Sequence, residues 1–163
     1  FPSISAGVLY PPELVTDVSK FQIYCEKRDI QPCVRLNGTT DIRWELIKID
    51  GQNIFEIFPN VQFYDYTKIA NRKCKDIPNY HLTWSYSNAN PEYAKLLDKV
   101  IEGGMNVAVV FRSEYKKSLW CTYPVVDGDK DDLRFLDPKG RHIVALYAKG
   151  AAKKDTSGFV QEV

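Results

Sequence analysis

Carboxylates and basic groups that could bind a charged ligand stand directly after apolar stretches of the sequence. Asp41, Asp65 and Asp127 are the carboxylates in these positions, and we predict that they are catalytic. Carboxylates together with Lys and Arg could hold Mg²⁺ and a phosphate, because hard cations take oxygen ligands and basic groups stabilise anionic oxygens. Which metal would be involved stays open. The residues predicted to bind the ligand are Asn37, Thr39, Thr67, Lys68, Ser85 and Arg112.

These residues are far apart in the sequence, so only a fold that gathers strand ends could make one site of them. Apolar and β-forming stretches predict strands over residues 32–36, 61–67, 80–87, 107–111 and 143–147. Apolar residues at helical spacing predict helices over residues 13–28, 53–58 and 91–102. In a parallel sheet the loops that follow the carboxyl ends of the strands lie along one edge, where their side chains can meet.

The order of these elements predicts an α/β fold with a mainly parallel sheet, or a partial β/α barrel, with flanking helices. A chain of 163 residues is long enough for one core, and we expect a single α/β domain over residues 1–163. A closed eightfold barrel needs about 250 residues and is excluded for this chain alone. Because the first residue is Phe1 and not Met, we expect that the natural N-terminal segment is missing.

Several well-known site motifs do not occur. The sequence contains no G-x-S-x-G, H-E-x-x-H or G-x-x-x-x-G-K-[ST], which removes the α/β-hydrolase elbow, the zincin helix and the P-loop. The four cysteines lack C-x-x-C spacing, so they do not support an iron–sulfur cluster, and the cofactor is unknown. We expect them to be buried free thiols in a reducing cytosol. The sequence contains no apolar run of about 18 residues and therefore does not predict membrane insertion.

Two of the candidate stretches also fit a purely structural role. Residues 37–41 contain Asn-Gly and are typical of a turn that closes a strand and caps a helix. Residues 127–132 look like a calcium-binding loop but lack its ligand spacing. A solvated acidic turn is therefore the alternative to a metal or substrate role for Asp127.

Six stretches of the chain, taken together, are similar to a known protein family. They include RLNGTTDI at residues 35–42, FYDYTK at 63–68 and NVAVVF at 106–111, and the others lie within residues 79–85, 127–138 and 148–160. The chain resembles the bacteriophage proteins of the gene-product-88 type, whose activity is not settled. The resemblance implies an α/β fold and a phage origin. The family is in turn distantly similar to partial β/α barrels of the radical S-adenosylmethionine kind, and its usual upstream segment rich in Cys, Pro and Thr does not occur in this sequence.

Two hypotheses for the function follow. The first is a bacteriophage enzyme or degenerate enzyme in the host cytoplasm, whose strand-end loops bind a phosphorylated or nucleotide-like small molecule. The second is a non-catalytic accessory protein that binds a host protein or other host macromolecule. A net charge of +1 gives no reason to expect broad nucleic-acid binding. Nucleic-acid binding by a local basic patch is the third and weaker hypothesis. It rests on Lys68, Arg72, Lys73, Lys75, Lys153 and Lys154.

Overall fold

The sheet is organised around β4 (Asn106–Phe111), in which every residue except Val110 is buried. In the computed structural model, which describes residues 12–163, β3 (Tyr80–Ser85) and β7 (Ile143–Tyr147) lie parallel to β4, one on each side. Such a continuous apolar strand is typical of a parallel sheet that is covered on both faces. The short strand β8 (Val160–Gln161) pairs with the end of β4, beyond the last residue that pairs with β3.

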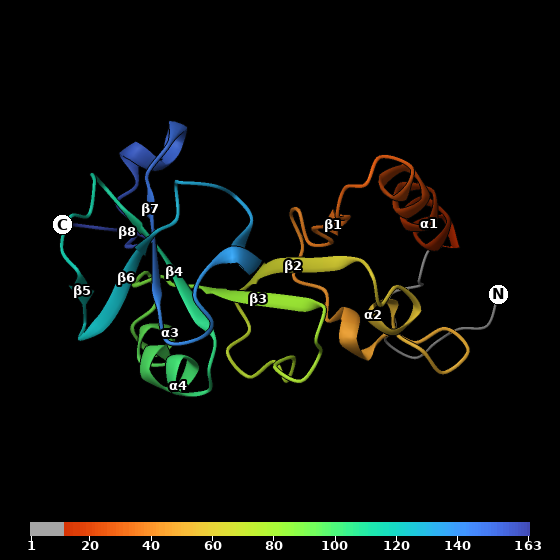
Figure 1. Ribbon diagram of the computed structural model, residues 1–163. Coiled ribbons are helices and arrows are strands. Elements are labelled where there is room, and N and C mark those ends of the chain that lie inside the picture. The colour runs from red at the N-terminus through yellow and green to blue at the C-terminus, as the bar shows by residue number, and fades with distance from the viewer. Residues whose placement is uncertain (1–11) are drawn as a thin grey trace.

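The remaining strands extend the sheet on both sides of this centre. β2 (Gln62–Thr67) and β1 (Cys33–Val34) follow β3, while β6 (Tyr123–Asp127) and β5 (Leu119–Trp120) follow β7. All neighbouring pairs within the described residues are parallel except β5 with β6. In Figure 1, β2 and β3 run across the direction of β4 and β7, as expected for a strongly twisted sheet. The predicted α/β fold with a mainly parallel sheet is confirmed, and β1 and β5 form the two edges of that sheet.

The register between neighbouring strands leaves part of β3 without a partner on one side. β2 pairs with β3 from Tyr80 onwards, whereas β4 begins opposite Thr83. No residue of β4 therefore lies opposite residues 80–82, and the sheet is open at this point on its amino-terminal edge.

The helices fall into two groups (Figure 1). α1 (Pro12–Glu26) and α2 (Ile54–Ile57) lie near β1 and β2, and α3 (Pro91–Ala94) and α4 (Leu97–Glu102) lie near β4. At α2 the side chain of Asn53 accepts from the backbone N–H groups of Phe55 and Glu56, while Glu56 accepts from the N–H of Asn53. This capping box satisfies donors that a helix start would otherwise leave unpaired. No helix in residues 12–163 is both long and apolar enough to cross a membrane.

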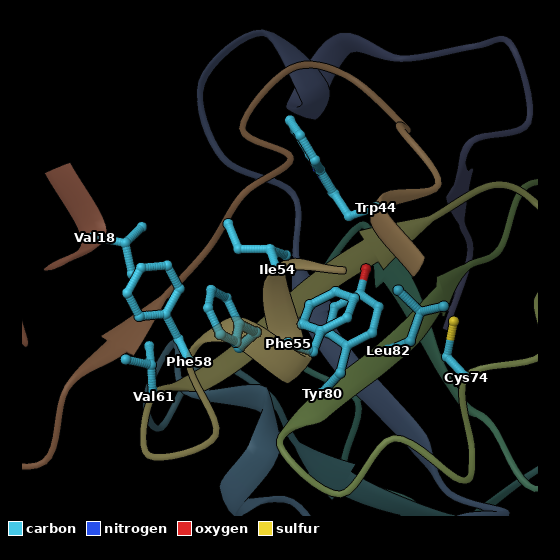
Figure 2. Packing of buried hydrophobic residues seen from close by; sticks show 10 residues of the cluster. Val18, Trp44, Ile54, Phe55, Phe58, Val61, Cys74, Tyr80 and Leu82 are labelled. Atoms are coloured by element: carbon cyan, nitrogen blue, oxygen red, sulfur yellow. The ribbon is translucent and has the colours of Figure 1, made fainter. Parts of the chain in front are cut away.

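The buried side chains form two hydrophobic clusters that correspond to these two groups. The first surrounds α2 and β2, where the ring of Phe55 stacks on Tyr80 at 4.2 Å between centroids (Figure 2). The Phe55 ring also meets Phe63 edge-on at 5.2 Å. The second surrounds Trp84 and the apolar face of α4. Met105 packs against both clusters and so connects them.

Three local features differ from the sequence-based expectations. The helix expected over residues 91–102 is divided into α3 and α4, because the Leu96 N–H bonds the Tyr93 carbonyl three residues back. β5 and β6 were not predicted, because their two-residue turn is Cys121-Thr122, with positive φ at both residues, and not the usual Asn-Gly. The four cysteines are free, as expected, but Cys121 is exposed on this turn and only Cys25 and Cys74 are buried.

The core around β2 makes a prediction about stability. Phe63→Ala removes a ring with 0% exposure and is expected to lower the free energy of unfolding by about 3–5 kcal/mol, because it leaves a cavity that the core cannot refill. Phe21→Ala, at a position 38% exposed on α1, is the matched control and is expected to cost much less. Urea unfolding measures both changes. Equal losses in the two variants would contradict this description of the core.

Candidate functional site

The site is centred on Asp65, a carboxylate on the buried face of β2. Side chains alternate along the strand, so Phe63, Asp65 and Thr67 point to the same buried side. Asp65 has 0% exposure. Its Oδ1 accepts from the backbone N–H of Asn37 at 2.7 Å, and its Oδ2 accepts from the hydroxyl of Tyr80 at 3.1 Å. Both carboxylate oxygens are therefore bonded to protein groups.

Asn37 holds the loop after β1 onto this face of β2. Its side-chain Oδ1 accepts from Thr40 Oγ1 at 2.9 Å, from the Ile42 N–H at 3.1 Å and from Trp44 Nε1 at 3.0 Å. Its Nδ2 donates to the Ile42 carbonyl at 3.1 Å. Residues 37–42 are thus an ordered turn, as one of the two interpretations of this stretch predicts, and the turn also brings Asp41 to the end of β2.

Asp41 receives three kinds of donor at the carboxyl end of β2. Its oxygens accept from Thr67 Oγ1 at 2.8 Å and 3.0 Å, from the Lys68 N–H at 2.6 Å and from Arg72 Nη1 at 3.2 Å. The Asp41 side chain is 26% exposed. It is thus the carboxylate of this group that a molecule in solution can reach.

Arg72 bonds Asp41 directly and is connected to Asp65 through the Tyr80 hydroxyl. It was not predicted as part of the ligand site. Its guanidinium donates to Glu45 from Nε at 3.1 Å and from Nη2 at 2.5 Å, and Nη2 also donates to the Tyr80 hydroxyl at 3.0 Å. Its side chain has 0% exposure. We call the connected residues the β2 network. They are Asn37, Asp41, Glu45, Asp65, Thr67, Arg72 and Tyr80.

Burial controls the protonation of the β2 network. It raises the pKa of Asp65 to about 6, although the Asn37 N–H and the Tyr80 hydroxyl oppose the shift. Burial also raises the pKa of Tyr80, and the neighbouring carboxylate Asp65 adds to the rise. For Arg72 burial disfavours the charge, but the hydrogen-bonded Glu45 outweighs it and holds the pKa above its ordinary value. Tyr80 therefore stays a hydrogen-bond donor and Arg72 stays a cation.

Lys68 lies at the carboxyl end of β2, next to the β2 network. Its ammonium donates to the Ser85 carbonyl at 3.1 Å and lies 5.0 Å from the ring centre of Phe159 and 5.5 Å from that of Tyr93. Burial lowers the pKa of Lys68, and the charge of Asp41 opposes that change. Ser85 contributes its backbone carbonyl to this contact.

Three of the predicted site residues lie elsewhere. Thr39 is exposed on the turn. Arg112 pairs with Glu162 at 2.7 Å and donates to two backbone carbonyls of the C-terminal segment, at 2.8 Å each. Asp127 ends β6, four strand positions from β2 in the sheet, which at ~4.8 Å per strand is about 19 Å away. Its Oδ1 accepts from the Asp129 N–H at 2.9 Å, as in an acidic turn.

No group of three or more His, Cys, Asp or Glu residues in the described chain is arranged to hold a metal ion. The carboxylates of the β2 network are instead occupied by Arg72, Lys68, Tyr80 and backbone donors. The sequence signal for this arrangement is a single Arg within the lysines of residues 68–75, since guanidinium suits paired carboxylates better than ammonium does. Nothing in the sequence indicates which carboxylates Arg72 meets.

One comparison with known proteins, with a family profile, covers almost the whole chain. The sequence profile of a family described as gene product 88 matches residues 9–163. Neither a curated protein nor a solved structure is similar enough to count as a match.

The raised pKa of Asp65 makes a prediction about stability and pH. The folded state holds the Asp65 proton more tightly than the unfolded chain does, so this stabilising contribution is complete below about pH 4 and is lost as the pH rises to about 6. The total is roughly 3 kcal/mol. In Asp65→Asn the contribution is absent, and the free energy of unfolding by urea should fall less between about pH 4 and about pH 7.

Asp17→Asn, which removes an exposed carboxylate from α1, is the control for the loss of one negative charge. If Asp65→Asn and the wild-type protein lose equal stability over this pH range, Asp65 does not titrate as described.

Proposed function

The chain belongs to the gene product 88 family of bacteriophage proteins, and we propose that it acts in the host cytoplasm as an enzyme-like or degenerate domain. We propose further that this domain binds a phosphate-bearing or nucleotide-like ligand. The proposed site is the carboxyl edge of β2 and β3. Lys68 contacts the anion, and Asp41 and Thr67 hold the loop that carries it. The similarity to partial barrels of the radical S-adenosylmethionine kind stays a hypothesis.

The position of Lys68 is the observation that supports this proposal. An ammonium group has three donors, and one of them is used by the Ser85 carbonyl. The rings of Phe159 and Tyr93 lie on its sides and partly desolvate it. A cation with free donors in partly desolvated surroundings binds an anion more strongly than a fully hydrated surface lysine does.

The bonding of the carboxylates favours binding over turnover. Asp65 has 0% exposure and both of its oxygens accept hydrogen bonds, and Asp41 accepts from Thr67, Lys68 and Arg72. Groups with such partners hold a structure in place. The catalytic roles of Asp41, Asp65 and Asp127 stay a prediction, and Asp41 is the best placed of the three because its side chain is 26% exposed.

Titration with inorganic phosphate and with adenosine triphosphate, followed by calorimetry, tests the proposal. We expect Lys68→Gln to weaken binding more than about tenfold, since a hydrogen bond to a charged group contributes about 1.5–3 kcal/mol. Lys20→Gln, the same substitution at an exposed position on α1, is the control and should bind as the wild type does. Equal affinities of Lys68→Gln and the wild type, or no binding of either compound, would disprove the proposal.

A second candidate function is the binding of a host macromolecule without catalysis. The helix α1 favours it, because Phe21 and Tyr24, three residues apart and so neighbours on the helix surface, are 38% and 50% exposed. Neighbouring exposed apolar side chains are typical of interaction surfaces.

Affinity capture from a host lysate tests this second function. We expect the wild-type protein and Lys20→Gln to retain the same host protein, and Phe21→Ser with Tyr24→Ser to lose it, because the apolar contact area is removed. Capture that is equal in all three proteins, or that yields no partner, would count against the role of α1.

A further inference from the structure

A large cleft lies at the amino-terminal edge of the sheet, opposite to the edge that carries Lys68. It forms where β4 begins opposite Thr83, which leaves the first residues of β3 without a neighbouring strand on the side of β4. The cleft has a volume of about 970 Å³. Its walls are the loop at residues 70–78, the turn at 103–106 before β4 and the turn at 139–141 before β7. We call it the amino-edge cleft.

The rim of the amino-edge cleft is strongly basic. Its lining includes six of the chain's 22 Lys and Arg residues but one of its 21 Asp and Glu residues, Asp76, although the whole chain has a net charge of +1. Arg72 is used by the β2 network. The five remaining cations are exposed, and in residues 12–163 none of them forms an ion pair with a carboxylate. They are Lys73, Lys75, Lys99, Lys139 and Arg141.

The lining of the cleft includes two ring side chains, those of His81 and Phe135. Nε2 of His81 is buried and has no hydrogen-bond partner in the described part of the chain. Burial, together with the charges of Arg134 and Lys139, lowers the pKa of His81 to about 4, so the ring is neutral at pH 7. Phe135 also lines the cleft, and its ring packs edge-on against Tyr64 at 5.5 Å between centroids.

We propose that the amino-edge cleft binds single-stranded nucleic acid. Its cations come from two loops and from α4, which suits a chain with several phosphates better than it suits one compact anion. Phe135 gives the cleft an aromatic ring on which a base can stack. An acidic peptide would meet the same cations but has no base for this ring.

This surface differs from the basic patch that the sequence indicates. Lys73 and Lys75 belong to both, but Arg72 points into the β2 network and Lys68 lies at the opposite edge of the sheet. Lys153 and Lys154 belong to a 3-10 turn near β8, whose backbone is bonded to Arg112. The free cations of the cleft therefore do not include Lys68, Arg72, Lys153 or Lys154. They include Lys99, Lys139 and Arg141 instead, which no sequence pattern connects to residues 73–75.

The test is the binding of a fluorescent oligothymidine of about 20 nucleotides, followed by anisotropy at several salt concentrations. Binding by single strands should fall with a slope of about −0.7 per phosphate contact in a plot of log K against log salt, so five contacts give about −3.5. Lys73→Gln with Lys75→Gln should reduce the slope by about 1.4 and weaken binding roughly 25-fold at 0.1 M salt. Lys139→Gln with Arg141→Gln, on another wall, should have the same effect.

The matched control is Lys153→Gln with Lys154→Gln, which removes two positive charges outside the cleft. It should keep the wild-type slope. Three results would overturn the proposal: no binding by the wild-type protein, equal weakening in the control and the cleft variants, or equal affinity for polyglutamate of the same length. Full competition by thymidine monophosphate at a concentration equal to that of the oligonucleotide's phosphates would also overturn it, because the cleft would then hold one phosphate group and not a strand.

This inference is independent of the ligand site proposed at Lys68. Lys68→Gln should leave oligothymidine binding unchanged, and the Lys73 and Lys75 substitutions should leave the affinity for adenosine triphosphate at Lys68 unchanged. The two proposals can therefore fail separately.

Discussion

A carboxylate on the buried face of β2 is the constraint on which much of this structure depends. An ionisable group with 0% exposure needs hydrogen-bond partners, because an unpaired charge inside a protein is very costly. Asp65 obtains them directly from the turn after β1 through Asn37 and from β3 through Tyr80, and Arg72 in the loop after β2 in turn bonds Tyr80. The requirement to satisfy one side chain thus aligns three segments that are far apart in the sequence.

The carboxyl edge of the sheet, where the parallel strands end, differs from the amino edge, where they begin. At the carboxyl edge of β2 and β3, hydrogen bonds among side chains and to the backbone hold the β2 network and Lys68 in place. At the amino edge the late start of β4 leaves the amino-edge cleft, whose rim has five cations without carboxylate partners among the described residues. A chain that is almost neutral overall therefore has a local field that attracts anions on one side.

Part of the candidate site could be predicted and part could not. Asp41, Thr67 and Lys68 were singled out because polar residues at the ends of parallel strands gather at one edge, and the structure does bring these three together, while their functional roles stay predictions. Arg112 and Asp127 satisfy the same rule, but Arg112 follows the central strand β4 and Asp127 ends β6, farther still from β2. Strand order decides which strand ends are neighbours, and it is set by long-range packing, which local sequence patterns do not contain.

By itself the sequence determined most of the elements and the fold class, but not β5, β6 or β8. The apolar run of β4, the alternation of β2 and the Asn53 cap of α2 depend on residues close together in the chain, so local patterns suffice to predict them. Only the tertiary structure decided the union of Arg72 with Asp41, Glu45 and Tyr80, and the meeting of Lys75, Lys99 and Arg141 around one cleft. These contacts join distant residues through the strand order and the offset between β3 and β4, and such geometry exists only once the whole sheet has formed.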